Sequence, residues 1–225
     1  MSMKIKTTNN TKQVISRKRV IDHGEVFTSE REVNAMLDLV KQETLRIESR
    51  FLEPACGTGN FLHEVLRRKL EIVENRYKKS QLEYERYAVM AIGSIYGIDL
   101  LEDNVIACRK RLFDLFVEQY ENLYSQVAKD ECKESVRFIL ERNILRGDAL
   151  TLSTVGENSE PIVFSEWSLV NGSMIKRRDF SFKALLECES VKALPLFSDK
   201  GDEVYIPTPI KEFPVTHFLR IAHVE

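Results

Sequence analysis

The segment 50–62, Arg-Phe-Leu-Glu-Pro-Ala-Cys-Gly-Thr-Gly-Asn-Phe-Leu, constrains the fold more than any other part of the chain. It has the pattern of a short apolar strand, a turn that contains Gly57 and Gly59, and the start of a helix. Glycine has no Cβ, so the turn can take positive φ and let a ligand approach the backbone closely. The first N–H groups of the following helix point back at the turn with a partial positive charge. The segment therefore predicts a site for a carboxylate, a ribose or a phosphate.

Strand-like and helix-like segments alternate along the chain. Helical spacing of apolar residues predicts helices over 61–73, 81–92 and 103–129. Short apolar runs predict further strands, over 94–100, 143–150 and 161–164. This alternation is typical of an α/β fold, a parallel sheet with helices on both faces.

Acidic residues stand at or just past the ends of three of the predicted strands. These are Glu53, Asp99 and Asp148. Ligands of parallel α/β sheets bind outside the carboxyl ends of the strands. Any one of these acids alone could be a solvated carboxylate. Together, at one edge of one sheet, they indicate a shared ligand crevice.

The 225 residues suggest one sizeable domain with two appendages. We expect a polar N-terminal arm over 1–22, a main domain over 23–182 and a proline-containing, irregular C-terminal extension over 183–225. Ser29 followed by Glu32 fits a capping box that would start an N-terminal helix. The extension is apolar, and it either packs on the domain or covers a partner.

Composition excludes several classes of protein. The net charge of −2 gives no overall attraction to nucleic acid or to an anionic membrane. The four cysteines and four histidines lack metal-ligand spacing, so we expect no metal. The N-terminus lacks an apolar core, and no apolar run reaches the roughly 20 residues of a membrane-spanning helix. We therefore expect a cytoplasmic protein without a membrane partner.

Four segments resemble, in order, the motifs of the N6-adenine DNA methyltransferases of restriction-modification systems. The residues 53–62, Glu-Pro-Ala-Cys-Gly-Thr-Gly-Asn-Phe-Leu, resemble the first motif of that family, and 96–99, Tyr-Gly-Ile-Asp, the second. The residues 147–149, Gly-Asp-Ala, resemble the third, and 23–29 resemble the upstream motif, with Ser29 in place of its usual proline. A dinucleotide enzyme is less favoured, because Leu62 occupies the third glycine position of that fingerprint.

The resemblance implies a Rossmann-like fold that binds S-adenosylmethionine. By that resemblance Asp99 would accept hydrogen bonds from the ribose hydroxyls of the cofactor, and Asp148 would accept one from its adenine amine. Glu53 and Thr28 would face the ammonium and carboxylate groups of its methionine part. The full set of implied cofactor-binding residues is Thr28, Glu53, Pro54, Ala55, Cys56, Gly57, Gly59, Asn60, Asp99, Leu100, Asp148 and Ala149.

The fourth motif of that family, Asp/Asn/Ser-Pro-Pro-Tyr/Phe, is missing, because the chain contains no Pro-Pro. In the family this motif accepts the hydrogens of the adenine amine and stacks on the flipped base. At the corresponding place stand Ser165, Glu166 and Trp167. Ser165 or Glu166 could accept a hydrogen bond from the adenine amine, and Trp167 could stack on the base. A strand end packed by its tryptophan is the simpler interpretation. No catalytic residue is assigned beyond these weak candidates.

The favoured hypothesis is the S-adenosylmethionine-binding subunit of an N6-adenine DNA methyltransferase. A second chain would carry Asn-Pro-Pro-Tyr and the target recognition, and DNA would be contacted through that partner. The basic residues 176–178 could add a substrate or partner contact. A non-catalytic S-adenosylmethionine-binding module and a truncated methyltransferase are the alternatives.

Overall fold

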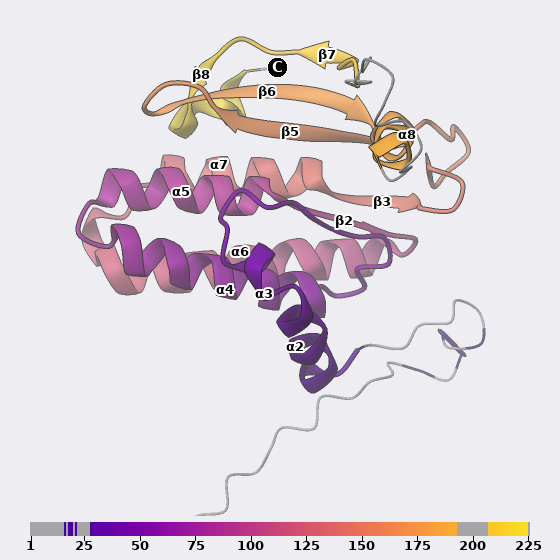
Figure 1. Cartoon of the computed structure of the whole chain (residues 1–225), viewed down its shortest axis with the longest axis horizontal. Helices are drawn as coiled ribbons and strands as arrows, with labels where there is room; N and C mark the ends of the chain where they lie inside the picture. Colours follow the sequence, from indigo (N-terminus) through magenta and orange to yellow (C-terminus); the bar gives the residue numbers. More distant parts are fainter. Residues whose placement is uncertain (1–15, 17, 20, 22–27, 193–206, 225) are drawn as a thin grey trace, which may run out of the picture.

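The computed structural model describes residues 16, 18–19, 21, 28–192 and 207–224, and the main elements are stacked in three layers (Figure 1). The first layer holds α4 (Asn60–Tyr77) and α6 (Glu102–Tyr124). In the middle layer α5 (Gln81–Gly93) leads into β2 (Ile95–Asp99), and α7 (Asp130–Asn143) leads into β3 (Ile144–Asp148). An antiparallel sheet forms the third layer (Figure 1).

The strands of the middle layer form a mostly parallel sheet. Its order is β1 (Phe51–Glu53), β2, β3 and β4 (Ser153–Thr154), and only the short β4 is antiparallel to its neighbour. Two helices stand between each pair of consecutive parallel strands, α4 and α5 before β2, and α6 and α7 before β3. The predicted α/β class with a mostly parallel sheet is therefore confirmed.

The two faces of this sheet are covered differently. On one face Gly97 lies against α4, where a Cβ would come within 2.9 Å of the side chain of Leu62. On the other face Tyr96 and Ile98 pack in an apolar cluster with Phe164 and Phe182. The expectation of helices on both faces is corrected here, since this second face is covered by a strand of the other sheet together with one helix.

The antiparallel sheet consists of β5 (Val163–Leu169), β6 (Met174–Ser181), β7 (Lys211–Glu212) and β8 (Thr216–His217). The prediction that 161–164 belongs to a fourth strand of the parallel sheet is wrong, because β5 pairs with β6 over its whole length. The hairpin turns at Gly172, whose φ is +53°. An Asn-Gly pair between two strands is a strong hairpin signal.

The C-terminal part of the chain packs on the domain. The irregular extension expected after residue 182 begins instead with the helix α8 (Phe182–Lys192). The 3₁₀ helix η3 (Phe218–His223) lies against α7, and Phe218 and Ile221 are buried in the main core. Of the two alternatives for the extension, packing on the domain is the one observed for residues 207–224.

One predicted helix is shorter than expected. The pattern over 103–129 suggested a single helix, but α6 ends at Tyr124 and a 3₁₀ turn, η1 (Ser125–Val127), separates it from α7. Sequence reasoning missed α7 altogether. Its side chain Phe138 packs edge-to-face on Trp167, so α7 links the parallel sheet to the antiparallel one.

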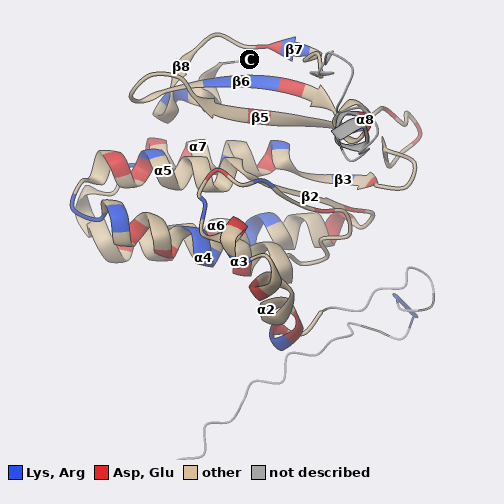
Figure 2. Cartoon of the chain, viewed as in Figure 1, with Lys and Arg blue, Asp and Glu red and all other residues tan. Residues whose placement is uncertain are grey.

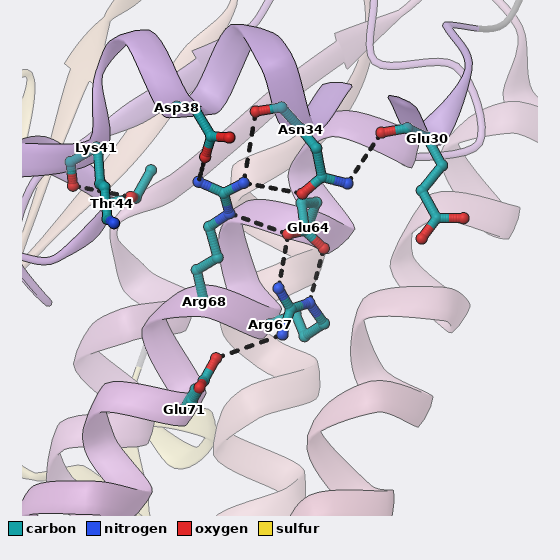
Figure 3. A network of polar contacts seen from close by, with 9 residues as sticks. All are labelled: Glu30, Asn34, Asp38, Lys41, Thr44, Glu64, Arg67, Arg68 and Glu71. Atoms are coloured by element: carbon teal, nitrogen blue, oxygen red, sulfur yellow. Dashed lines mark hydrogen bonds and ion pairs between the residues drawn. The ribbon is translucent and has the colours of Figure 1, made fainter. Parts of the chain in front are cut away.

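The N-terminal helix α2 (Glu30–Leu39) is held on α4 by a charged network (Figure 3). Its capping box is present as predicted, since Ser29 and Glu32 bond each other's backbone N–H groups. Arg68 of α4 donates to Asp38 at 2.8 Å and to Asn34 at 2.8 Å. Arg67, the first member of the basic run 67–69, pairs with Glu64 at 2.7 Å and is 44% exposed. The third member, Lys69, is fully buried and donates to the carbonyl of Ile47 at 3.0 Å.

Candidate functional site

A cavity of about 510 Å³ lies at the carboxyl ends of β1, β2 and β3. This volume is within the usual range of small-molecule sites. Eleven of the twelve predicted cofactor-binding residues line it, and Gly59 does not. Sequence reasoning missed six lining residues, Met36, Phe61, Leu101, Asn104, Gly147 and Leu150.

The glycine turn takes the backbone conformation that the sequence predicts. Gly57 and Gly59 have φ of +51° and +85°, and Gly59 is the N-cap of α4. A Cβ on Gly59 would come within 2.7 Å of Sγ of Cys108 on α6. Gly59 therefore shapes the turn by close packing against α6, while Gly57 and Asn60 form the cavity wall.

The carboxylate of Asp99 connects β2 to the glycine turn. One oxygen accepts from the backbone N–H of Gly57 at 2.9 Å. The other accepts from the N–H of Leu101 at 2.9 Å and from the side-chain amide of Asn104 at 3.1 Å. This carboxylate is thus fixed in position at the cavity wall. Its partners show why the turn and the N-terminus of α6 lie side by side.

Asp148 and two leucines form the opposite end of the site. Asp148 ends β3 and accepts from the backbone N–H of Leu150 at 2.8 Å. Leu150 is 94% exposed and Leu100 is 45% exposed, although both line the cavity. Large exposed apolar side chains beside a carboxylate suit a flat ligand ring with a polar edge. Leu150 could have been suspected from its place directly after the third motif.

Glu53 and Cys56 occupy the part of the wall nearest to β1. Burial raises the pKa of the Glu53 carboxyl, partly offset by a hydrogen bond from the backbone of Ala55. The pKa of the Cys56 thiol is raised by its hydrogen bond with Cys108 and by burial. Cys56 is therefore a neutral, buried wall residue, whereas Glu53 is a carboxylate in a partly desolvated position that favours a cationic partner.

The charge of the cavity lining is one-sided. Three carboxylates line it, those of Glu53, Asp99 and Asp148, and none of the described lining residues is lysine or arginine. All charged side chains that a phosphate-rich ligand would meet here are negative. A ligand with a positive centre is favoured instead.

Thr28 lines the cavity from the chain that precedes α2. Its backbone carbonyl accepts from the side-chain amide of Asn60 at 3.0 Å. Asn60 in turn accepts from Arg111 of α6. The rest of the upstream motif, residues 23–27, lies outside the described residues.

Ser165, Glu166 and Trp167 do not line this cavity. Ser165 donates to Asp179 at 2.7 Å, and Glu166 forms ion pairs with Arg50 and Arg178. The indole N–H of Trp167 donates to Asn143 at 3.3 Å within the core. Each of the three side chains therefore has a structural partner inside the fold, in agreement with the simpler interpretation of this segment, a strand end packed by its tryptophan.

The basic residues 176–178 lie in the blue part of β6 in Figure 2, and each is paired with an acidic side chain. Lys176 contacts Glu212 at 2.5 Å and Arg177 contacts Asp179 at 2.8 Å. Their place along β6 puts them on the antiparallel sheet rather than in the cavity wall. They hold β6 to its neighbours and do not form a free cationic surface.

Neither a metal-binding cluster nor a membrane-spanning helix is found in the described part of the chain. This part contains no group of three or more His, Cys, Asp or Glu side chains that could hold a metal ion. It also contains no helix long and apolar enough to cross a membrane. Comparison with family models, with curated proteins and with solved structures finds no match to this chain.

Proposed function

We propose that the chain is the S-adenosylmethionine-binding subunit of an N6-adenine DNA methyltransferase. In this proposal the cavity at the carboxyl ends of β1 to β3 takes the cofactor. A second chain supplies the residues that receive adenine, and the complex transfers the methyl group to adenine N6 in DNA.

One observation carries the cofactor part of the proposal, the meeting of three sequence motifs in one cavity. The glycine turn, Asp99 and Asp148 are separated by tens of residues in the sequence, and all line the same space. In the proposed complex Asp99 faces the ribose, and Asp148 faces the adenine amine between Leu100 and Leu150. Glu53 then faces the methionine ammonium.

The charge of the lining also favours this cofactor over a dinucleotide. S-adenosylmethionine carries a sulfonium and an ammonium group, and three carboxylates line the cavity. NAD carries a pyrophosphate, which needs N–H groups or basic side chains. In this cavity one N–H of the turn, that of Gly57, already donates to Asp99.

The split of the enzyme over two chains rests on the residues at the place of the fourth motif. Ser165, Glu166 and Trp167 are engaged within the fold and lie outside the cavity lining. Glu166 is paired with two arginines and Ser165 is bonded to Asp179, and neither stands beside the paired prolines that set the geometry of the fourth motif. This supports a partner chain that carries Asn-Pro-Pro-Tyr and supplies the acceptor site for the base.

Titration calorimetry tests the cofactor, and a methylation assay tests the split. The chain should bind S-adenosylmethionine and give no heat with NAD. It should transfer no methyl group to DNA alone and should do so when the partner is added. Robust methylation by the isolated chain would contradict the split. Cofactor binding without any partner that restores methylation would favour the non-catalytic module.

A further inference from the structure

Arg19 of the N-terminal arm reaches the start of α6, beside the cavity. Its guanidinium contacts both carboxylate oxygens of Asp103, at 2.5 Å and 3.3 Å. It also donates to the side-chain oxygen of Asn104 at 3.2 Å. Arg19 is only 22% exposed in its side chain, and it lowers the pKa of the Asp103 carboxyl. Arg19 thus contacts two residues of α6, Asp103 and Asn104, which lie 84 and 85 positions after it in the sequence.

Asn104 carries this contact into the cavity. It is 2% exposed and lines the cavity. While its oxygen accepts from Arg19, its amide nitrogen donates to Asp99 at 3.1 Å. The contact with Arg19 fixes which end of the amide faces Asp99, because an arginine can only donate. A flipped amide would turn its oxygen toward the carboxylate and repel it.

A second contact with a residue of the cavity wall is made by Thr28, which precedes α2. Nine residues after Arg19, the carbonyl of Thr28 accepts from Asn60, which follows the glycine turn. Arg19 is thus attached to the wall formed by α6, and Thr28 to the wall formed by α4. Both attachments end on residues that line the cavity, Asn104 and Asn60.

We infer that Arg19 is a positioning residue for the ligand of this cavity, acting through Asn104 on the carboxylate of Asp99. The arm and the ligand then stabilise each other's binding, since a ligand that needs Asp99 in this orientation favours the docked Arg19. The inference rests on the proposed function, because the ligand is taken to be S-adenosylmethionine.

Calorimetry on the full chain with S-adenosylmethionine tests the inference. Arg19→Ala should weaken binding about fivefold or more, the lower end of typical coupling between sites. Arg19→Lys should restore only part of the loss, because an ammonium lacks the planar fork that spans Asp103 and Asn104. Lys18→Ala is the matched control, since Lys18 is exposed and adjacent in sequence. The melting temperature without ligand should differ by no more than about 2–4 °C among the four proteins, because an ion pair this exposed contributes about 0–1 kcal/mol.

A double-mutant cycle identifies the route. In an Asn104→Ala background, Arg19→Ala should cause little further loss, because the side chain through which it acts is gone. If the two substitutions reduce the affinity independently, so that their fold-losses multiply, the inference is overturned while the proposed function stands. An Arg19→Ala protein that binds the cofactor as tightly as Lys18→Ala would have the same consequence. No binding by the unmodified chain would overturn the proposed function and, with it, this inference.

Discussion

The carboxylate of Asp99 accepts a hydrogen bond from the backbone N–H of Gly57 at 2.9 Å. The strand β2 and the glycine turn after β1 are therefore joined by one side chain, 42 residues away from the turn in sequence. This carboxylate has a structural role in the turn as well as its proposed role at the ribose. A substitution there should change both stability and binding.

Asp99→Ala should lower the free energy of unfolding by about 1–3 kcal/mol, because N–H groups of Gly57 and Leu101 lose their acceptor. It should weaken S-adenosylmethionine roughly 10- to 100-fold, as expected for loss of charged hydrogen bonds. Urea unfolding and calorimetry measure the two effects. Asp114→Ala, at a 56% exposed carboxylate on α6, serves as the control. Unchanged binding in Asp99→Ala would contradict the ribose assignment.

Binding of S-adenosylmethionine should weaken as the pH falls through the raised pKa of Glu53. Above that pKa the carboxylate pairs with the ligand ammonium, and below it the proton takes the place of the ion pair. Calorimetry from about pH 8 to about pH 5 covers the range above the ordinary pKa of the group. Glu53→Gln should bind more weakly and should lose this pH dependence. A Glu53→Gln protein with the same pH profile would assign the titration to another group.

Gly59→Ala should destabilise the protein more than Gly172→Ala. Both glycines have positive φ, +85° and +53°, so both alanines suffer backbone strain of about 1–2 kcal/mol. Only at Gly59 would the new Cβ meet Sγ of Cys108 at 2.7 Å, whereas Gly172 has open space. Overpacking adds about 1–3 kcal/mol. Equal losses in urea unfolding would show that the turn can move away from α6.

Phe218→Ala should cost about 3–5 kcal/mol of unfolding free energy, because a fully buried phenylalanine leaves a cavity against α7. Val215→Ala, at a side chain 44% exposed, should change it by about 0.5 kcal/mol or less. A small effect of Phe218→Ala would mean that η3 contributes little to the core.

The stability of the protein should rise with pH in a way that depends on Lys69. Burial lowers the pKa of Lys69 to about 7. The unfolded chain then binds more protons than the folded one between about pH 7 and about pH 10, so unfolding becomes harder as the pH rises. Lys69→Met should be less stable, because the carbonyls of Ile47 and Ser49 lose their donor, and its stability should rise less between about pH 7 and about pH 9. Parallel pH profiles of the two proteins would contradict this.

The sequence predicted the cavity better than the architecture around it. Glycine turns and strand-end acids are local signals, and the carboxyl ends of parallel strands meet at one edge, so eleven predicted residues came together. Leu150 and Asn104 were missed because they lie outside the motifs themselves. Leu150 directly follows the third motif, and Asn104 comes five residues after Asp99, the last residue of the second. Arg19 was missed because its contact joins parts of the chain that no local pattern connects.

The apolar run of β5 alone does not show whether this strand belongs to the parallel or to the antiparallel sheet. Phe164 and Trp167 are both buried, although they point to opposite faces of the same strand. A short run of this kind fits a central parallel strand as well as an antiparallel one. The pair Asn171 and Gly172 is the local signal for the hairpin, because an Asn-Gly pair favours a tight turn between antiparallel strands.

The core that contains Val33 also contains Ile221, 188 residues further along the chain (221 − 33). Contacts of such long range form late, because the loop between them must first be closed. During synthesis the strands and helices that surround the cavity leave the ribosome before η3 does. Until η3 docks, the surface of α7 that it covers stays open to chaperones or to other chains. Folding of the ligand site and completion of the core are thus separate events in time.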